Sequence, residues 1–140
     1  VQRLDDAATG LTFLSDGRLV IAGSSVRFID LNTGRFSTLV PSGQHTTSGD
    51  IVGLPDGFLY WSIAENGEKL ARIDPNTGSV TVIGPLSKSS LYGLGYTDGT
   101  LYGFSDQGYI IGVDPSNANT TSSQRLSQNW WGATTNPVTW

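Results

Sequence analysis

The sequence offers few residues for nucleophilic or acid–base chemistry. His45 is the only histidine, and it lies in the segment SGQHTTSGD together with serine and aspartate. A histidine, a serine and an aspartate could form a hydrolytic triad. The chain contains no G-x-S-x-G nucleophile elbow, however, so we interpret His45 as an exposed loop residue between two repeats. We expect no catalytic residues and predict that the protein is not an enzyme.

The carboxylates show no pattern of a metal site or of a catalytic pair. Many of the aspartates precede glycine or proline, where a short acceptor side chain stabilises a turn. The calcium-loop spacing D-x-D-x-D-G is absent, and one histidine without any cysteine cannot complete a zinc site. A glycosidase needs two carboxylates at a defined separation, which a sequence does not reveal. We therefore expect no metal and no cofactor, and we interpret the adjacent pair Asp5-Asp6 as solvated.

The aromatic residues are the group best suited to binding. Rings gathered on one face could stack on sugars, as in a lectin, but large rings also fill the space between twisted sheets. We favour packing for the group as a whole, which comprises Trp61, Trp130, Trp131, Trp140, Tyr92, Tyr96 and Tyr109. Trp130-Trp131 is the exception, because adjacent residues of a strand point to opposite faces and one ring should meet whatever completes that sheet.

The composition narrows the class of protein. The 140 residues carry a net charge of −4 with only 14% charged residues, so nucleic acid is not an expected partner. The basic residues Lys88, Arg27, Arg35 and Arg72 are scattered, and we interpret them as solvated surface. No apolar run is long enough to cross a bilayer. Low charge, abundant serine and threonine and no sulfur favour an extracellular or cell-surface location.

Two turn motifs recur along the chain with nearly constant spacing. The stretches GLTFLSDGRLV, IVGLPDGFLYW and LYGLGYTDGTLYG align on their Asp-Gly pairs, which begin at Asp16, Asp56 and Asp98. A second turn follows each of them, in FIDLNTG, RIDPNTG and the looser GVDPSNANT. Two anchors that recur in the same order indicate an internal repeat of about 40 residues.

Each repeat contains four short runs rich in β-branched and aromatic residues. Asp-Gly between two such runs is a strong hairpin signal, and the Asp-x-Asn-Thr-Gly turns predict a second hairpin with Gly34 or Gly78 in the left-handed conformation. The third run of each repeat has apolar residues at both parities, which predicts a sheet buried on both faces. Four antiparallel strands per unit are typical of a β-propeller blade. In the second repeat the runs are Ile51–Leu54, Phe58–Ile63, Lys69–Ile73 and Ser79–Ile83.

These hairpin motifs carry a resemblance to a known group of proteins. With DGFLYW, DGTLYG, DPNTG and DLNTG, the chain resembles secreted bacterial β-propeller repeat proteins, which have D-G-x-L-Y and D-P-x-T-G hairpins. Its composition and final tryptophan also give a weak similarity to cyanobacterial exported proteins. The resemblance implies a propeller fold, and it leaves the function open because such families include enzymes, lectins and scaffolds.

The two ends of the chain echo each other. Gln-Arg-Leu occurs at 2–4 and again at 124–126, and in both places the next strand begins with the same spacing. We predict a single all-β domain over 1–140, a partial β-propeller of three four-stranded antiparallel blades plus the terminal strands of a composite further blade. The expected repeats span about 10–41, 50–86 and 91–127, with terminal half-blade segments at 1–6 and 129–140.

Unpaired sheet at both ends must be covered. Three arrangements remain open: a closed monomer, blades shared between copies in a closed oligomer or filament, and a fragment of a longer propeller. We favour completion by another copy and predict a non-enzymatic, extracellular, self-assembling structural protein. A carbohydrate-binding propeller, with glycans as partners, is the alternative, and a hydrolase is the third reading. The expected assembly interface comprises Val1, Gln2, Arg3, Leu4, Trp130, Trp131, Val138 and Trp140.

Overall fold

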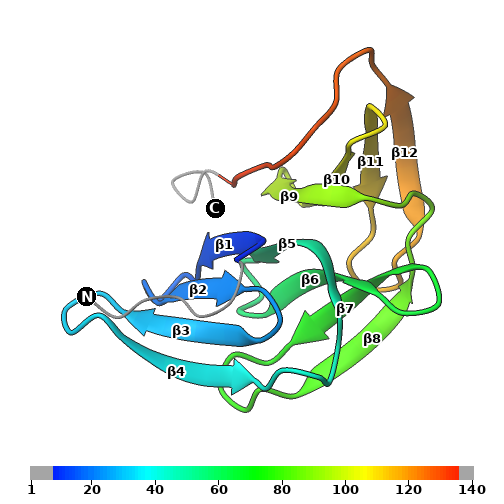
Figure 1. Ribbon diagram of the computed structural model, residues 1–140. Coiled ribbons are helices and arrows are strands. Elements are labelled where there is room, and N and C mark those ends of the chain that lie inside the picture. The colour runs from blue at the N-terminus through cyan, green and yellow to red at the C-terminus, as the bar shows by residue number, and fades with distance from the viewer. Residues whose placement is uncertain (1–7, 136–140) are drawn as a thin grey trace.

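The computed structural model describes residues 8–135, and their regular structure consists of twelve strands in three four-stranded sheets (Figure 1). Every sheet is an antiparallel meander that follows the order of the chain. The strands are β1 (Gly10–Phe13), β2 (Leu19–Ala22), β3 (Val26–Asp30), β4 (Arg35–Val40), β5 (Thr47–Gly53), β6 (Leu59–Ala64), β7 (Glu68–Ile73), β8 (Val80–Pro85), β9 (Leu91–Thr97), β10 (Thr100–Ser105), β11 (Tyr109–Val113) and β12 (Thr120–Arg125).

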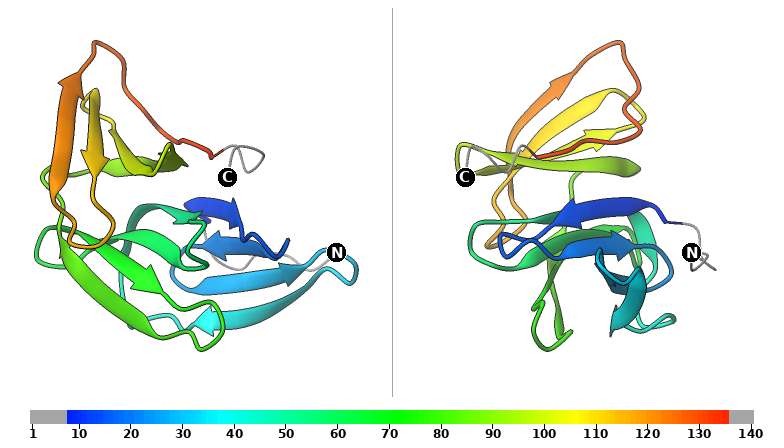
Figure 2. Two further views of the ribbon diagram at one scale, coloured as in Figure 1. Left: turned by 180° about the vertical axis from the view of Figure 1, so that it is seen from behind. Right: turned by 90° about the vertical axis from the view of Figure 1, so that its left-hand side faces the viewer.

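The three sheets fan out around a common axis, with β1, β5 and β9 innermost (Figures 1 and 2). We call β1–β4 blade 1, β5–β8 blade 2 and β9–β12 blade 3. Adjacent first strands lie side by side, β1 against β5 and β5 against β9. The predicted all-β, partial β-propeller fold is confirmed.

The predicted turn chemistry accounts for the hairpins within each blade. In blade 3 the two residues Asp98 and Gly99 connect β9 to β10, both with positive φ (49° and 77°), as a primed hairpin turn requires. In blade 2 the corresponding loop is one residue longer, and Asp56 Oδ1 accepts a backbone N–H two residues further on. Gly34 and Gly78 have φ of 66° and 74°, which confirms the left-handed conformation expected for the second turns.

Apolar side chains on both faces of the sheets pack between the blades. We call the face that a blade turns toward the preceding blade proximal, and the face toward the following blade distal. At the first interface the distal residues Val20, Ala22 and Val26 of blade 1 pack against the proximal residues Ile51, Leu59 and Trp61 of blade 2. At the second interface the distal residues Tyr60 and Leu70 of blade 2 pack against the proximal residues Leu101, Ile111 and Val113 of blade 3. The burial of both faces, inferred above from the third strands, is thus present in blade 2.

Some strand bounds differ from the sequence-based ones. The first strand of blade 2 begins at Thr47 rather than Ile51, because an irregularity in the pairing between these two residues lets the strand continue. Residues 126–135 form no strand and run from the outer edge of blade 3 back to the axis (Figure 1). The predicted interface residues Val1, Gln2, Arg3, Leu4, Val138 and Trp140 lie outside the described residues, and the repeat bounds stay predictions.

Candidate binding groove at the centre of the blades

The first strands of blades 1 and 2 approach each other closely. A Cβ atom on Gly10 would lie 2.7 Å from the backbone nitrogen of Ile51, so only glycine fits at this position. The hydroxyl of Thr12 accepts the backbone N–H of Gly53 at 3.1 Å. A side chain of β1 therefore satisfies a backbone group of the next first strand.

Residues 132–135 repeat this relation on the far side of blade 3. A Cβ atom on Gly93 would lie 2.7 Å from the backbone nitrogen of Ala133. The hydroxyl of Thr135 accepts the backbone N–H of Tyr96 at 2.8 Å. Residues 132–135 thus occupy the place of the first strand of a further blade, next to β9.

Asp50 ties the first strands of all three blades together. Its carboxylate accepts the backbone N–H of Ile51 (2.8 Å) within blade 2 and of Leu94 (2.9 Å) in blade 3. The backbone N–H of Leu11 in blade 1 donates to the same carboxylate. The three donors occupy the same register position in their blades. Burial raises the pKa of Asp50 to about 6, against the effect of the three N–H donors, which lower it.

Sequence reasoning placed Asp50 among the turn carboxylates and missed this role. The corresponding positions of blades 1 and 3 are Gly10 and Gly93, and a Cβ on Gly10 would lie 2.7 Å from Asp50 Oδ1. The signal that could have found it is the context SGDIVG, in which an aspartate lies inside an apolar strand and precedes neither glycine nor proline. A buried acid in such a place must accept hydrogen bonds from the backbone around it.

The raised pKa of Asp50 predicts that stability falls as the pH rises from about 4 to about 6. Over this range the folded protein keeps a proton on Asp50 that the unfolded chain releases, so protonation favours the fold. The difference between 3.8 and about 6 corresponds to roughly 3 kcal/mol. Urea unfolding of the wild type and of Asp50→Asn at pH 4, 5 and 7 measures it, and the variant is expected to lack this slope. Equal pH profiles for the two proteins would contradict the prediction.

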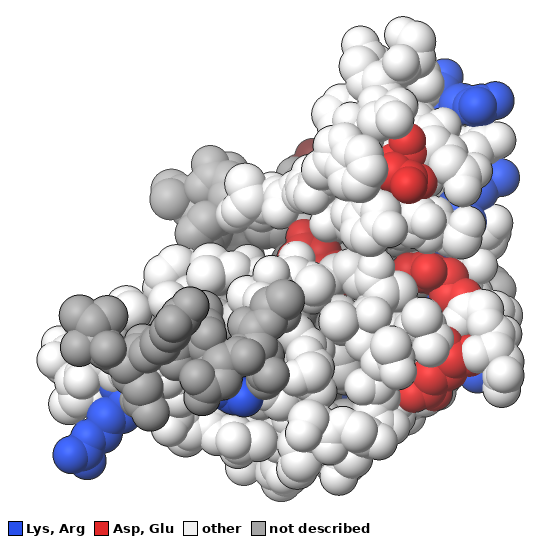
Figure 3. Space-filling view, viewed as in Figure 1, with Lys and Arg blue, Asp and Glu red and all other residues white. Residues whose placement is uncertain are grey.

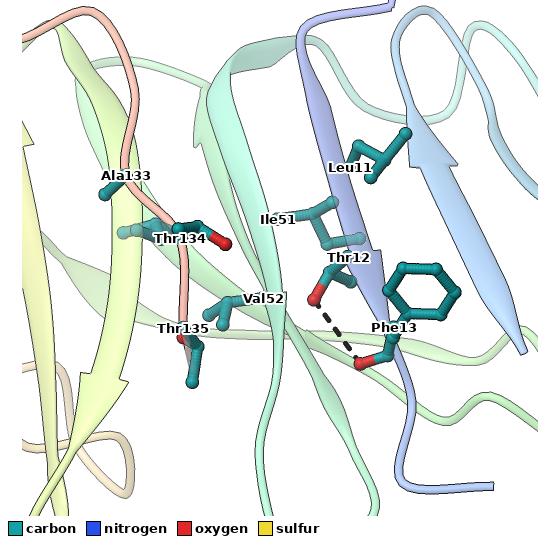
Figure 4. A pocket seen from close by; sticks show the side chains of 9 residues that line it. Leu11, Thr12, Phe13, Ile51, Val52, Ala133, Thr134 and Thr135 are labelled. Atoms are coloured by element: carbon teal, nitrogen blue, oxygen red, sulfur yellow. Dashed lines mark hydrogen bonds between the residues drawn. The ribbon is translucent and has the colours of Figure 1, made fainter. Parts of the chain in front are cut away.

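A groove lies between β1 and residues 131–135, and we call it the central groove (Figure 4). Its narrow end, of about 120 Å³, is lined by apolar side chains and threonines. Its wide end, of about 280 Å³, is lined by Asp50, Tyr92, Trp131 and the backbone around them. Leu11 and Ala133 border both ends. The narrow end is lined by Leu11, Thr12, Phe13, Ile51, Val52, Leu94, Ala133, Thr134 and Thr135.

The central groove gathers exposed apolar side chains. Leu11, Phe13 and Trp131, which line it, are 56%, 44% and 71% exposed. Only two other large apolar side chains among the described residues, Leu31 and Val82, are exposed, and neither lines the groove. Uncharged residues dominate the face seen in Figure 3, and most of the basic side chains visible there lie toward its periphery. An apolar patch collected at one place is typical of a binding surface.

The predicted interface pair Trp130-Trp131 places its two rings in different surroundings. Trp130 is half-buried and meets Phe104 edge-on at 5.7 Å, and its buried indole N–H has no hydrogen-bond partner in residues 8–135. Trp131 is exposed and stacks on Tyr92 with 5.5 Å between ring centroids and 17° between planes. The membership of both residues in an assembly interface stays a prediction.

The other candidate residues lie in structural contacts. His45 Nδ1 is 2.5 Å from Glu65 Oε1, and its ring meets the buried Trp61 edge-on at 6.1 Å. The His45 side chain is therefore largely covered rather than exposed in a loop. In residues 8–135, no three histidine, aspartate or glutamate side chains are grouped so that they could hold a metal ion.

Two of the basic residues are more than solvated surface. Arg72 lies over the Phe58 ring at 4.6 Å, and Lys88 lies over the Tyr109 ring at 4.1 Å. Both cations pack on aromatic faces because the ring quadrupole attracts them.

Within the described part of the chain, no helix has the length and hydropathy needed to cross a bilayer.

Comparison with known proteins supports the propeller fold. A family model described as a repeat of unknown function (DUF6923) matches residues 4–136. The crystal structure of the mitotic checkpoint complex contains a similar chain (TM-score 0.67, 16% identity, 90% of this chain and 40% of the other), and so does the structure of U3-55K (0.67, 16%, 89% and 38%). A protein of unknown function from Bacteroides caccae is also similar (0.60, 11%, 95% and 50%).

This chain spans half or less of the length of each of the three matched chains. At such low identities the likeness shows the fold alone. No curated protein matches the sequence.

Proposed function

The chain belongs to the family of repeats of unknown function DUF6923, and we propose that it is a non-enzymatic, extracellular structural protein whose blades assemble with those of further copies. Its low charge and lack of sulfur support the extracellular location.

The observation that carries the proposal is the exposure of β1 on the proximal face of blade 1, a face on which Leu19 and Ile21 of β2 are buried. Leu11, Ile51 and Leu94 occupy the same position in the three blades. Ile51 and Leu94 are 1% and 2% exposed because a preceding blade covers them, whereas Leu11 is 56% exposed. Phe13, on the same face of β1, is 44% exposed. This face has the side chains of a blade interface, and a blade of the same repeat is the partner that such a face fits.

The distal face of blade 3 is the complementary surface. Its residues Tyr102, Phe104 and Ile110 are half-buried, although the equivalent residues of blade 1, Val20, Ala22 and Val26, are fully buried. Residues 132–135 already hold the place of the next first strand, so strands added outside them would complete a blade on this face. One copy therefore presents both sides of the same kind of interface, which suits head-to-tail assembly into a closed oligomer or a filament.

We expect Phe13→Asp to weaken assembly by more than tenfold, because it places a charge in an apolar interface (a loss above about 1.4 kcal/mol). Sedimentation velocity and light scattering at micromolar concentration give the molecular mass of each species, and the wild type is expected to be larger than one chain.

The matched control is Val82→Asp, since Val82 is 39% exposed on β8 and lies away from the groove. It should assemble like the wild type. A wild-type protein that stays monomeric under these conditions would overturn the proposed function.

A further inference from the structure

The wide end of the central groove differs in chemistry from the apolar face of blade 1. It combines one exposed aromatic ring, a second ring behind it and a buried carboxylate around a hollow of about 280 Å³. We propose that this end of the groove binds a neutral saccharide, which stacks on Trp131 and donates a hydroxyl to Asp50. The proposal goes beyond assembly, which is tested at Phe13, a residue that lines only the narrow end, whereas Leu11 borders both ends of the groove.

Trp131 is a preorganised platform. One face of its indole stacks on Tyr92, with 17° between the ring planes, while the side chain remains 71% exposed. An exposed tryptophan in a soluble protein gives up favourable burial, and here the stack also restricts the freedom of the ring. A flat apolar surface that is already oriented suits the C–H face of a pyranose ring.

Polar groups for sugar hydroxyls lie in the same hollow. Asp50 is 5% exposed and lines the hollow, and its carboxylate accepts the backbone N–H groups of Ile51, Leu94 and Leu11. Since the two oxygens of a carboxylate offer about four acceptor sites, these three donors leave room for one hydroxyl of the ligand. Thr9 also lines the hollow, and its hydroxyl lies 3.1 Å from that of Thr47.

Charge and size select the class of saccharide. Among the described residues that line the wide end, Asp50 is the only charged one, so its carboxylate would repel an acidic sugar. The volume of about 280 Å³ lies just below the roughly 300 Å³ at which pockets for drug-sized ligands begin. The hollow therefore suits one ring of a neutral saccharide rather than a longer stretch of a glycan.

Titration calorimetry and tryptophan fluorescence with maltotetraose, cellotetraose, chitotetraose and tetragalacturonate test the proposal. We expect at least one neutral oligosaccharide to bind with a millimolar dissociation constant and to shift the emission of Trp131, and tetragalacturonate to bind at least tenfold more weakly. Trp131→Ala should weaken binding by about tenfold or more. Tyr92→Phe, which keeps the stack, should bind within about twofold of the wild type.

The controls separate this site from assembly and from general unfolding. Tyr109→Ala removes an aromatic ring that lies between Lys88 and Arg125, elsewhere on blade 3, and should leave binding unchanged. Phe13→Asp should bind the saccharide like the wild type even if it no longer assembles. Failure of all three neutral oligosaccharides to bind at millimolar concentration, or binding that survives Trp131→Ala, would overturn the site without bearing on assembly.

Discussion

Asp50→Ala is expected to lower the free energy of unfolding at pH 7 by roughly 3–5 kcal/mol. The carboxylate accepts backbone N–H groups of Leu11, Ile51 and Leu94, one from each blade. Each buried donor that loses its acceptor costs about 1–3 kcal/mol, and part of that loss is offset because an ionised, buried carboxylate is itself unfavourable. Urea unfolding followed by far-UV circular dichroism measures the change.

The matched control for this prediction is Asp74→Ala. Asp74 also accepts a backbone N–H, from Asn76 at 2.8 Å, but it lies in an exposed turn within one blade. Water can replace the lost acceptor there, so a much smaller change is expected. If the two substitutions reduced stability equally, the bridging of blades by Asp50 would carry no special weight.

Trp61→Ala is expected to reduce the free energy of unfolding by about 3–5 kcal/mol, the usual loss for a buried large ring. The indole is 1% exposed in the interface between blades 1 and 2, and its N–H donates to the Thr47 hydroxyl at 3.1 Å. Alanine would leave a cavity between two sheets that cannot close because their first strands are already in contact. Thermal or urea unfolding gives the change.

Trp131→Ala provides a control with the same change of side chain. Trp131 is 71% exposed, so its removal should alter stability by less than about 0.5 kcal/mol. A loss for Trp61→Ala as small as the one expected for Trp131→Ala would show that Trp61 is not a core residue of the blade interface.

The repeat and its turns could be predicted from the sequence because they depend on local chemistry. Asp98-Gly99 encodes a tight hairpin, and Gly34 and Gly78 encode the left-handed positions of the second turns. Apolar residues at both parities of the third strands, such as Leu70 and Ile73, predicted sheets covered on both faces. Such features need no knowledge of residues distant in the chain.

The groove could not be predicted in the same way, since it depends on contacts between repeats. Nothing local to Asp50 indicates that Leu11 and Leu94 donate to it, because these donors are main-chain groups of strands about 40 residues away. The stack of Trp131 on Tyr92 likewise requires residues 131–135 to return to the axis. The adjacent pair Trp130-Trp131 drew attention to Trp131 in the sequence, but the sequence did not predict that its ring stacks on Tyr92.

The place of Asp50 at the axis also constrains how such a chain can arise by gene duplication. Two adjacent repeats could not both carry the acid, because a side chain at Gly10 would collide with Asp50 Oδ1, 2.7 Å from where its Cβ would lie. Tandem copies that were identical at birth could therefore stack with glycine at this position, as in blades 1 and 3, and the acid could then enter only one of two adjacent repeats. Blades 1 and 2 are consequently not interchangeable. Exchanging their order would move the carboxylate out of the middle blade, from which it now accepts backbone N–H groups of the neighbouring first strands.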